Sequence, residues 1–336
     1  MTTMIKIAPF GTSDAKIVFN DNRQNILSLP EQEVLDLFNS FGLLLFRGFG
    51  VNYEQMVEFS GKFSSKYVRD PERQIVGSPD KFIQLVDNGT DYIPPHCENA
   101  VSPFRPDVVW FCCAVPAVED GETLFWDGVQ VWKELSEQTK QLFLSKKLKF
   151  MFDFDVDSWK LFFGSDSTLD DAKRAMEEFE EINYFVRDDR SIHMEYNCSA
   201  VVNTRTSSTK AFANSIIPWY HKQGRWEKIK SYLLEMYTNS TLGKFFGSLP
   251  QFLVTYLQAR PQRVTFEDGS LIPDVVIDEI NTIMDRLTGV IPWQSGDMVM
   301  IDNSRFLHGR RAFQDTRRQI YSHLSYLKPK KMKFRK

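Results

Sequence analysis

The sequence predicts a mainly β protein with flanking helices, built as one barrel-like β domain. Short apolar or alternating runs, bounded by turn residues, outnumber the segments with a helical period. The two stretches richest in candidate metal ligands lie around residues 96 and 308, near opposite ends of the 336-residue chain. No internal repeat or linker separates them. We therefore expect residues 1–336 to form a single domain, with a lid or insertion within 150–250 and a basic tail at 328–336.

The expected strands are short and lie along the whole chain. Residues 43–50 illustrate the pattern, because a run of leucine and phenylalanine there ends at glycines that mark a turn. Residues 1–25 are expected to add one or two edge strands. The other expected strands are residues 82–87, 107–114, 121–126, 147–156, 196–202, 210–215, 262–266, 298–301 and 318–327.

Helical segments are fewer. Residues 30–38 begin with Pro30 and acidic residues in the first turn, and Gly42 ends the apolar repeat that follows. The other expected helices are residues 53–63, 129–146, 168–181, 226–238 and 274–287.

The composition excludes several classes of protein. Hydrophobic residues make up 42% and charged residues 25%, which is ordinary for a globular protein and argues against a disordered or membrane protein. The net charge of −3 gives no general attraction to nucleic acid or anionic membranes. No two of the 4 cysteines form a CxxC motif, which argues against a zinc site made of thiolates. The cysteines are therefore expected to be buried thiols in a reducing compartment. We expect a cytoplasmic protein with a small-molecule substrate and no nucleic-acid or membrane partner; a homodimer is an open option.

The strongest chemical signal is His96 and Glu98, two residues apart after a Pro-Pro break. On a strand, both side chains would point to the same face, because side chains alternate with period two. A third ligand is available from His308, in the run that begins at Asp302. Two histidines and one carboxylate on one side of a metal are typical of non-heme Fe(II) oxygenases.

The remaining histidines have simpler interpretations. His193 and Glu195 repeat the H-x-E spacing, but they lack the preceding break, and the spacing alone arises often by chance. His221 follows two aromatic residues and is expected to be structural. His323 lies in an expected strand and could line either a pocket or the core.

Several motifs together resemble the TauD/TfdA-type Fe(II)/2-oxoglutarate-dependent dioxygenases, within the clavaminate synthase-like superfamily. The resemblance covers roughly residues 35–130 and 290–327, in the order of the family. It rests on residues 42–50, the His96–Glu98 triplet, Gly121-Glu122-Thr123, and the block from Gly296-Asp297 through Asp302-Asn303 and His308-Gly309-Arg310-Arg311 to Arg317-Arg318.

The resemblance implies a double-stranded β-helix, or jelly-roll, core with Fe(II) held by His96, Glu98 and His308. Many relatives have aspartate where this chain has Glu98, but glutamate occurs in several members that hydroxylate amino acids. A carboxylate here argues against halogenation, for which the position must be small. The separation of 210 residues from Glu98 to His308 exceeds that in compact members, which indicates an insertion.

The resemblance also implies where the co-substrate 2-oxoglutarate binds. Thr123 and Arg318 occupy the positions that hold its distal carboxylate in the family, and a planar guanidinium suits a carboxylate. Arg317 is the alternative anchor, because neighbours on a strand face opposite ways and only one can point inward.

The implied reaction consumes O2, converts 2-oxoglutarate to succinate and CO2, and oxidises an unactivated C–H bond of a small polar substrate such as an amino acid. Hydroxylation is expected, with desaturation and cyclisation open; no catalytic residue beyond the metal centre is needed. Polar residues that could contact the substrate are Gln84, Asn99 and Arg205, and Asn303 is expected to fix the turn or a ligand. The alternatives are an inactive jelly-roll binding protein and a cupin-type metalloenzyme that does not use 2-oxoglutarate.

Overall fold

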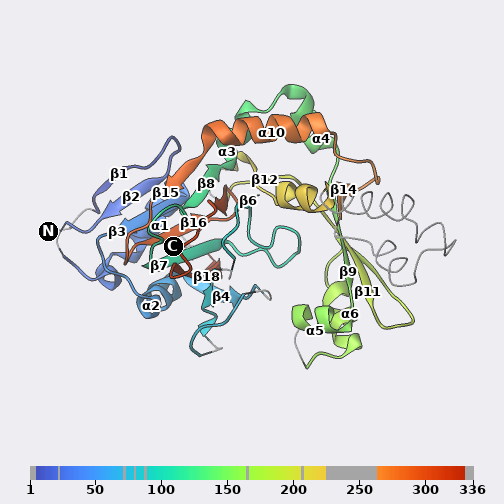
Figure 1. The fold of residues 1–336 in the computed structure, drawn as a ribbon, viewed down its shortest axis with the longest axis horizontal. Coiled ribbons are helices and arrows are strands. Elements are labelled where there is room, and N and C mark those ends of the chain that lie inside the picture. Colours follow the sequence, from blue (N-terminus) through green and yellow to red (C-terminus); the bar gives the residue numbers. More distant parts are fainter. Residues whose placement is uncertain are drawn as a thin grey trace, which may run out of the picture. The chain divides into compact units, whose positions relative to one another are not determined.

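A computed structural model describes residues 5–21, 23–70, 73–78, 81–86, 89–163, 166–205, 208–224 and 263–329. The chain divides into two compact units (Figure 1). Unit 1 contains residues 1–142, 200–215 and 275–336, and unit 2 contains residues 143–199 and 216–274. The single domain with an insertion within 150–250 stays a prediction. The expected helix at 226–238 and most of the basic tail at 328–336 lie outside the described residues.

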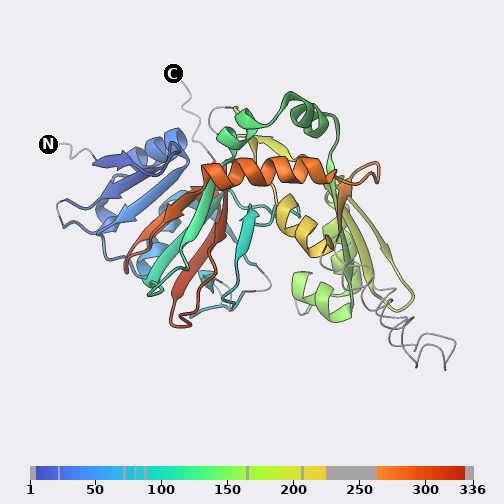
Figure 2. The same cartoon turned by 45° about the horizontal axis from the view of Figure 1, so that its top comes forward.

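The larger sheet of unit 1 joins both ends of the chain. Its strand order is β1-β2-β3-β16-β7-β18-β4, with β5 paired to β18. Blue N-terminal strands therefore lie beside orange and red C-terminal ones (Figure 2). All pairs in this sheet are antiparallel except β2 with β3. The bounds are β1 Ile7–Pro9, β2 Lys16–Phe19, β3 Leu43–Arg47, β4 Ser64–Val68, β5 Gln84–Leu85, β7 Val108–Val115, β16 Met298–Asp302 and β18 Gln319–Leu327.

A second, smaller antiparallel sheet of unit 1 has the order β15-β8-β17-β6. A separate two-stranded sheet pairs β12 with β13. The bounds are β6 Ile93–His96, β8 Thr123–Asp127, β12 Val201–Asn203, β13 Lys210–Phe212, β15 Gly289–Ile291 and β17 Phe306–Arg310, with helices α3 Gly128–Glu134, α4 Glu137–Ser145 and α10 Asp274–Leu287.

One hydrophobic core fills the space between the two main sheets. Phe125 and Phe306 contribute from the smaller sheet, and alternate residues of β3, β7 and β16 contribute from the larger one. The members of this core include Leu43, Leu45, Val109, Phe111, Val299 and Ile301. Two antiparallel sheets that face each other across a core form the predicted double-stranded β-helix, so the predicted fold class is confirmed.

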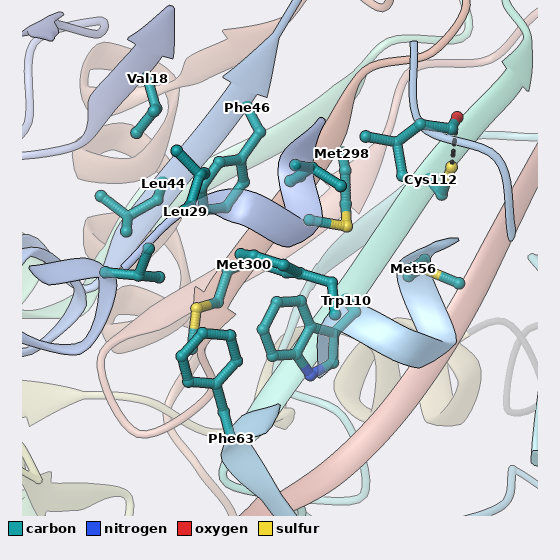
Figure 3. Close-up of a cluster of buried hydrophobic side chains, with 14 of the residues drawn as sticks. Val18, Leu29, Leu44, Phe46, Met56, Phe63, Trp110, Cys112, Met298 and Met300 are labelled. Carbon is teal, nitrogen blue, oxygen red and sulfur yellow. Dashed lines mark hydrogen bonds between the residues drawn. The ribbon is translucent and has the colours of Figure 1, made fainter. Parts of the chain in front are cut away.

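A second core covers the opposite face of the larger sheet (Figure 3). Strand residues such as Phe46, Trp110 and Met300 pack there against residues of η1 Ile26–Ser28, α1 Glu31–Phe41 and α2 Tyr53–Phe63; the latter include Ile26, Val34, Phe38, Met56, Phe59 and Phe63. Alternation along the strands assigns neighbouring residues to the two cores, so the larger sheet is buried on both faces.

The turn from α1 into β3 shows how local chemistry fixes an element boundary. Gly42 has a φ of 73°, and its N–H donates to the carbonyl of Phe38, which ends the helix. A Cβ at Gly42 would lie 2.8 Å from the ring of Phe306, so both the conformation and the space require glycine.

Unit 2 is built on a four-stranded antiparallel sheet in the order β10-β11-β9-β14. One face is apolar, where Trp219 packs 5.2 Å from Phe150 and 4.8 Å from Phe152, between ring centroids. The bounds are β9 Leu148–Phe154, β10 Ile182–Val186, β11 Ile192–Cys198 and β14 Arg263–Phe266, with helices α5 Val156–Phe163 and α6 Leu169–Glu177.

The predicted elements agree best where local signals are strong. The helices at 53–63 and 274–287 have the predicted bounds. The single helix predicted at 129–146 is wrong, because Ser136 separates α3 from α4 and accepts a hydrogen bond from the N–H of Thr139. The strand predicted at 196–202 is also wrong in its bounds, because β11 pairs with β9 from Ile192 onward.

Among the described residues, no helix has both the length and the apolar character needed to span a membrane.

His323 lies in the core beneath α2 rather than in a pocket. It is 1% exposed, its ring stacks on Tyr67 with centroids 4.3 Å apart, and Nδ1 lies 2.9 Å from Oγ of Ser60. The Ser60 hydroxyl also lies 3.0 Å from the carbonyl of Val57. Burial lowers the pKa of His323 to about 4.

We predict that His323 makes the protein less stable in acid. Between the unfolded pKa of about 6.5 and the folded pKa of about 4, only the unfolded chain binds this proton, so the free energy of unfolding falls as pH falls through this window. The full contribution is about 3 kcal/mol. Urea unfolding at pH 7.5 and 4.5 should show a smaller pH-dependent loss in His323→Asn than in the wild type; equal losses would contradict this assignment.

Candidate metal centre

His96, Glu98 and His308 come together in unit 1. Their candidate ligand atoms all lie within 4.8 Å of one another, and within the described part of the chain this is the one group of its kind. His96 ends β6 and lies directly opposite His308 in the β17–β6 pairing, so the two rings are 4.4 Å apart between centroids. Strand pairing therefore joins ligands that are far apart in sequence.

The expectation that Glu98 shares a strand face with His96 is wrong. β6 ends at His96, and Glu98 lies in the turn that follows. The buried side chain of Asn303 holds this turn: its Oδ1 accepts from the N–H of Glu98 at 2.9 Å, and its Nδ2 donates to the Glu98 carbonyl at 2.9 Å. The same Nδ2 donates to the carbonyl of Pro106 at 2.9 Å. Asn303 thus fixes the backbone of the carboxylate residue on both sides, as expected for this position.

The imidazole of His96 is prepared for metal binding. Its Nδ1 lies 2.9 Å from the carbonyl of Pro94, which can only accept, so Nδ1 carries the proton and the lone pair lies on Nε2. Burial, followed by the nearby charge of His308, lowers the pKa of His96 to about 4. The neutral form, which metals require, is therefore favoured at neutral pH.

The carboxylate of Glu98 is held ionised in a buried position. Its Oε1 lies 2.5 Å from Nη2 of Arg73 and 3.2 Å from Nε2 of His308. Burial alone would raise the pKa of Glu98, but the positive charge of Arg73 and the contacts with His308 outweigh it and hold the pKa below its usual value. Two imidazoles and one carboxylate form a donor set that fits a divalent iron ion.

Close packing of the backbone brings the two histidine strands together. A Cβ at Gly309, next to His308, would lie 2.4 Å from the carbonyl oxygen of Ile93, so only glycine allows β17 to approach β6 this closely. The ring of Phe111 lies 5.3 Å from that of His308, edge to face, and forms an apolar wall on the side of the larger sheet.

Thr123 lies on the same face of the smaller sheet as His308. His308 pairs with Phe125. Thr123 lies two residues before Phe125 in β8, opposite Arg310. Thr123 is buried, and its hydroxyl oxygen accepts from the indole N–H of Trp293 at 3.0 Å. The hydroxyl proton therefore stays available for an acceptor.

The two candidate arginines differ in their surroundings. Nε of Arg318 donates at 2.8 Å to the carbonyl of Gly121, which lies two residues before Thr123. The guanidinium of Arg318 lies 5.2 Å from the centre of the Phe313 ring. The side chain of Arg317 is 74% exposed and pairs with Asp315 at 2.9 Å. Of the two, Arg318 is the residue that packs against the turn before Thr123.

The three expected substrate residues all make contacts within the protein. The amide of Gln84 bonds to the backbone around Arg73. Nδ2 of Asn99 donates to the carbonyl of Phe104 at 3.4 Å, and Arg205 pairs with Asp107 at 2.5 Å. A substrate would have to compete with these contacts, so their substrate roles stay predictions.

The second H-x-E pair lies in unit 2 on β11. Nδ1 of His193 is 3.1 Å from Asp153, whereas Nε2 is 3.5 Å from Glu195. The two carboxylates thus face opposite nitrogens of one ring, and they also pair with Arg187 and Lys149, respectively. This arrangement is an ion-pair network rather than a convergent set of ligands.

Arg73, which contacts Glu98, is a residue of the site that was not predicted from the sequence. It lies in a polar stretch, where an arginine is usually solvated, and its role depends on neighbours that are distant in sequence. No local pattern marks it.

Comparison of the sequence with known proteins gives one family. The model of the family described as "Taurine catabolism dioxygenase TauD, TfdA family" matches residues 5–324. The dapdiamide synthesis protein DdaC of Enterobacter agglomerans is 26% identical over 292 residues, which cover 84% of this chain and 82% of the relative. A clavaminate synthase-like protein of Arabidopsis thaliana is 39% identical over 59 residues, 18% of each chain.

Solved structures share the fold at low sequence identity. PvcB of Pseudomonas aeruginosa gives a TM-score of 0.54 at 13% identity, covering 97% of this chain and 92% of that one. PvcB is described as an Fe, alpha-ketoglutarate dependent oxygenase from an isonitrile synthetic pathway. AAD-2, in complex with Mn(II) and N-oxalylglycine, gives a TM-score of 0.54 at 13% identity and covers 98% of each chain. At this identity the similarity establishes the fold.

We predict that Asn303→Ala weakens metal binding by about 10- to 100-fold, because the backbone of Glu98 loses its fixed position. The free Mn(II) signal in electron paramagnetic resonance measures this affinity. Asn183→Ala, which removes an exposed amide from β10 in unit 2, is the matched control and should leave Mn(II) affinity unchanged. A folded Asn303→Ala protein with wild-type affinity would show that this amide does not position the ligand.

Proposed function

Because the chain belongs to the TauD/TfdA family of iron- and 2-oxoglutarate-dependent dioxygenases, we propose that it hydroxylates an unactivated C–H bond of a small polar substrate, such as an amino acid or its derivative. We assign His96, Glu98 and His308 as the iron ligands. Bound iron and 2-oxoglutarate supply the oxidising chemistry, in which O2 is consumed and the keto acid becomes succinate and CO2.

One observation carries the assignment of the ligands. The candidate ligand atoms of His96, Glu98 and His308 converge within 4.8 Å on the inner face of the smaller sheet. Three protein ligands on one side leave the other side of an octahedral metal open for small molecules. Phe111 and the core between the sheets exclude water from the protein side of the centre.

We assign the distal carboxylate of 2-oxoglutarate to Thr123 and Arg318. A guanidinium and a hydroxyl together can donate several hydrogen bonds to one carboxylate. The contact of Arg318 with the carbonyl of Gly121 and the shared face of Thr123 and His308 support this assignment. The exposed pair of Arg317 with Asp315 makes Arg317 the weaker candidate.

The substrate class is supported by two indirect observations. The family resemblance associates a glutamate at the position of Glu98 with several members that hydroxylate amino acids. The relative with the longest match takes part, by its name, in dapdiamide synthesis, which is consistent with a small polar substrate. Asn99 and Arg205 are proposed as substrate contacts, with Gln84 in a supporting position. A homodimer is compatible with this function.

We predict that Arg318→Met weakens 2-oxoglutarate binding to the Mn(II)-loaded protein by about 10- to 100-fold, because a charge-assisted hydrogen-bond pair is lost. Isothermal titration calorimetry measures this affinity without turnover. Arg317→Met removes the same charge from an exposed position and should change the affinity less than about threefold. The opposite order of the two variants would move the anchor to Arg317.

A screen of amino acids and their amides for substrate-dependent succinate release tests the substrate class. We expect at least one to raise succinate formation above the uncoupled rate, with a product heavier by one oxygen atom. Turnover only with substrates of another class, at saturating iron and 2-oxoglutarate, would overturn the amino-acid proposal while leaving the assigned metal centre intact.

A further inference from the structure

All three nitrogen atoms of the Arg73 guanidinium make contacts next to the proposed metal centre. Nη2 lies 2.5 Å from Oε1 of Glu98, Nε lies 3.0 Å from Oδ2 of Asp70, and Nη1 donates to Oγ of Ser322 at 3.3 Å. The side chain of Arg73 is 11% exposed and that of Glu98 is 4% exposed. Because each nitrogen has a partner and one of the partners is a buried carboxylate, the guanidinium has a defined orientation, unlike that of a solvated surface arginine.

The backbone that carries Arg73 is also held. Nε2 of Gln84 donates to the carbonyls of Asp70 at 2.6 Å and Arg73 at 3.1 Å, and Oε1 of Gln84 accepts from the N–H of Asp70 at 2.9 Å. Gln84 is 2% exposed and belongs to β5, which pairs with β18 at Ser322. The position of Arg73 is therefore tied to the larger sheet.

Oε1 of Glu98 is shared between Arg73 and His308. When Nε2 of His308 binds a metal, it no longer donates to this oxygen, whereas the hydrogen bond from Arg73 can persist. Oε1, which lies 3.2 Å from Nε2 of His308, is then the oxygen that faces the metal, and its hydrogen bond from the fixed guanidinium sets the orientation of the carboxylate. Without Arg73, the carboxylate could rotate and present both oxygens to the metal.

We propose that Arg73 is a positioning residue that limits Glu98 to a single metal-bound oxygen. This inference rests on the proposed metal centre. Three ligand atoms from the protein and two from a chelating keto acid leave one position of an octahedral metal open. A carboxylate that bound through both oxygens would fill that position. Arg73 therefore keeps the centre open for its reaction.

The number of water molecules on bound Mn(II) tests this role without 2-oxoglutarate or turnover. Water-proton relaxation of the fully Mn(II)-loaded protein should report about three waters in the wild type, as expected for three single-atom ligands in an octahedral site. We expect about one water fewer in Arg73→Met, because Glu98 would contribute a second oxygen. Arg73→Lys, which keeps a charged donor, should retain the wild-type number.

Two further variants make the result specific. Arg69→Met removes an exposed guanidinium that stacks on Phe82 in the same region, and it should leave the hydration of Mn(II) unchanged. Gln84→Ala keeps the charge of Arg73 but releases its backbone, and it should lower the average hydration by a smaller amount. This variant carries the test if Arg73→Met does not fold.

Equal hydration in the wild type and Arg73→Met would overturn the inference, and so would wild-type hydration in Gln84→Ala if only that variant folds. A wild-type protein that does not bind Mn(II) would overturn both the inference and the proposed function. Loss of one water in Arg73→Met, together with no 2-oxoglutarate binding by the wild type, would support the role of Arg73 and reject the proposed reaction.

Discussion

The pairing of β17 with its two neighbours is the constraint on which the site depends. Through β6 it places His308 opposite His96, and through β8 it places Arg310 opposite Thr123. A shift of this register by one residue would turn His308 away from the inner face, because side chains alternate along a strand. The close approach at Gly309 fixes the register by sterics. The two histidines of the proposed metal centre, and the position of Thr123 relative to them, are thus set by one strand.

Three buried carboxylates of unit 1, Asp127, Asp297 and Glu98, pair with arginines, and Glu98 is the special case. Asp127 pairs with Arg305 at 2.6 Å, and Asp297 pairs with Arg47 at 2.7 Å, with both carboxylates almost fully buried. Such pairs cost desolvation free energy, and removal of one partner would leave an unpaired buried charge. Glu98 shares this pairing but also faces two histidines, which makes it a candidate metal ligand in addition to an ion-pair partner.

The sequence was sufficient to predict the features that depend on residues close together in the chain. Helix α2 has its predicted bounds because Asn52 and Gln55 form a capping box that can be read from the sequence. The candidate ligands could be identified because residue type and spacing reflect metal chemistry directly. Asn303 was expected to support a turn or a ligand, and it supports both, since its amide holds the turn that carries Glu98.

Features that depend on distant partners were beyond sequence patterns. β6 contains two prolines and ends before Glu98, so neither its strand state nor the position of that carboxylate follows from alternation. The break at Ser136 depends partly on Glu279, which accepts from the Ser136 N–H at 2.5 Å from another part of the chain. Arg73 acquires its role only because Gln84 and Glu98 are brought to it by the fold.

The most direct test of the central claim is anaerobic titration of Fe(II) and 2-oxoglutarate into the metal-free protein, followed by visible absorption. Chelation of the keto acid by iron at the assigned centre predicts a metal-to-ligand charge-transfer band that is lost in His96→Ala and in His308→Ala. Absence of the band in folded wild-type protein, or its persistence in both variants, would contradict the assignment of His96, Glu98 and His308 as the iron site.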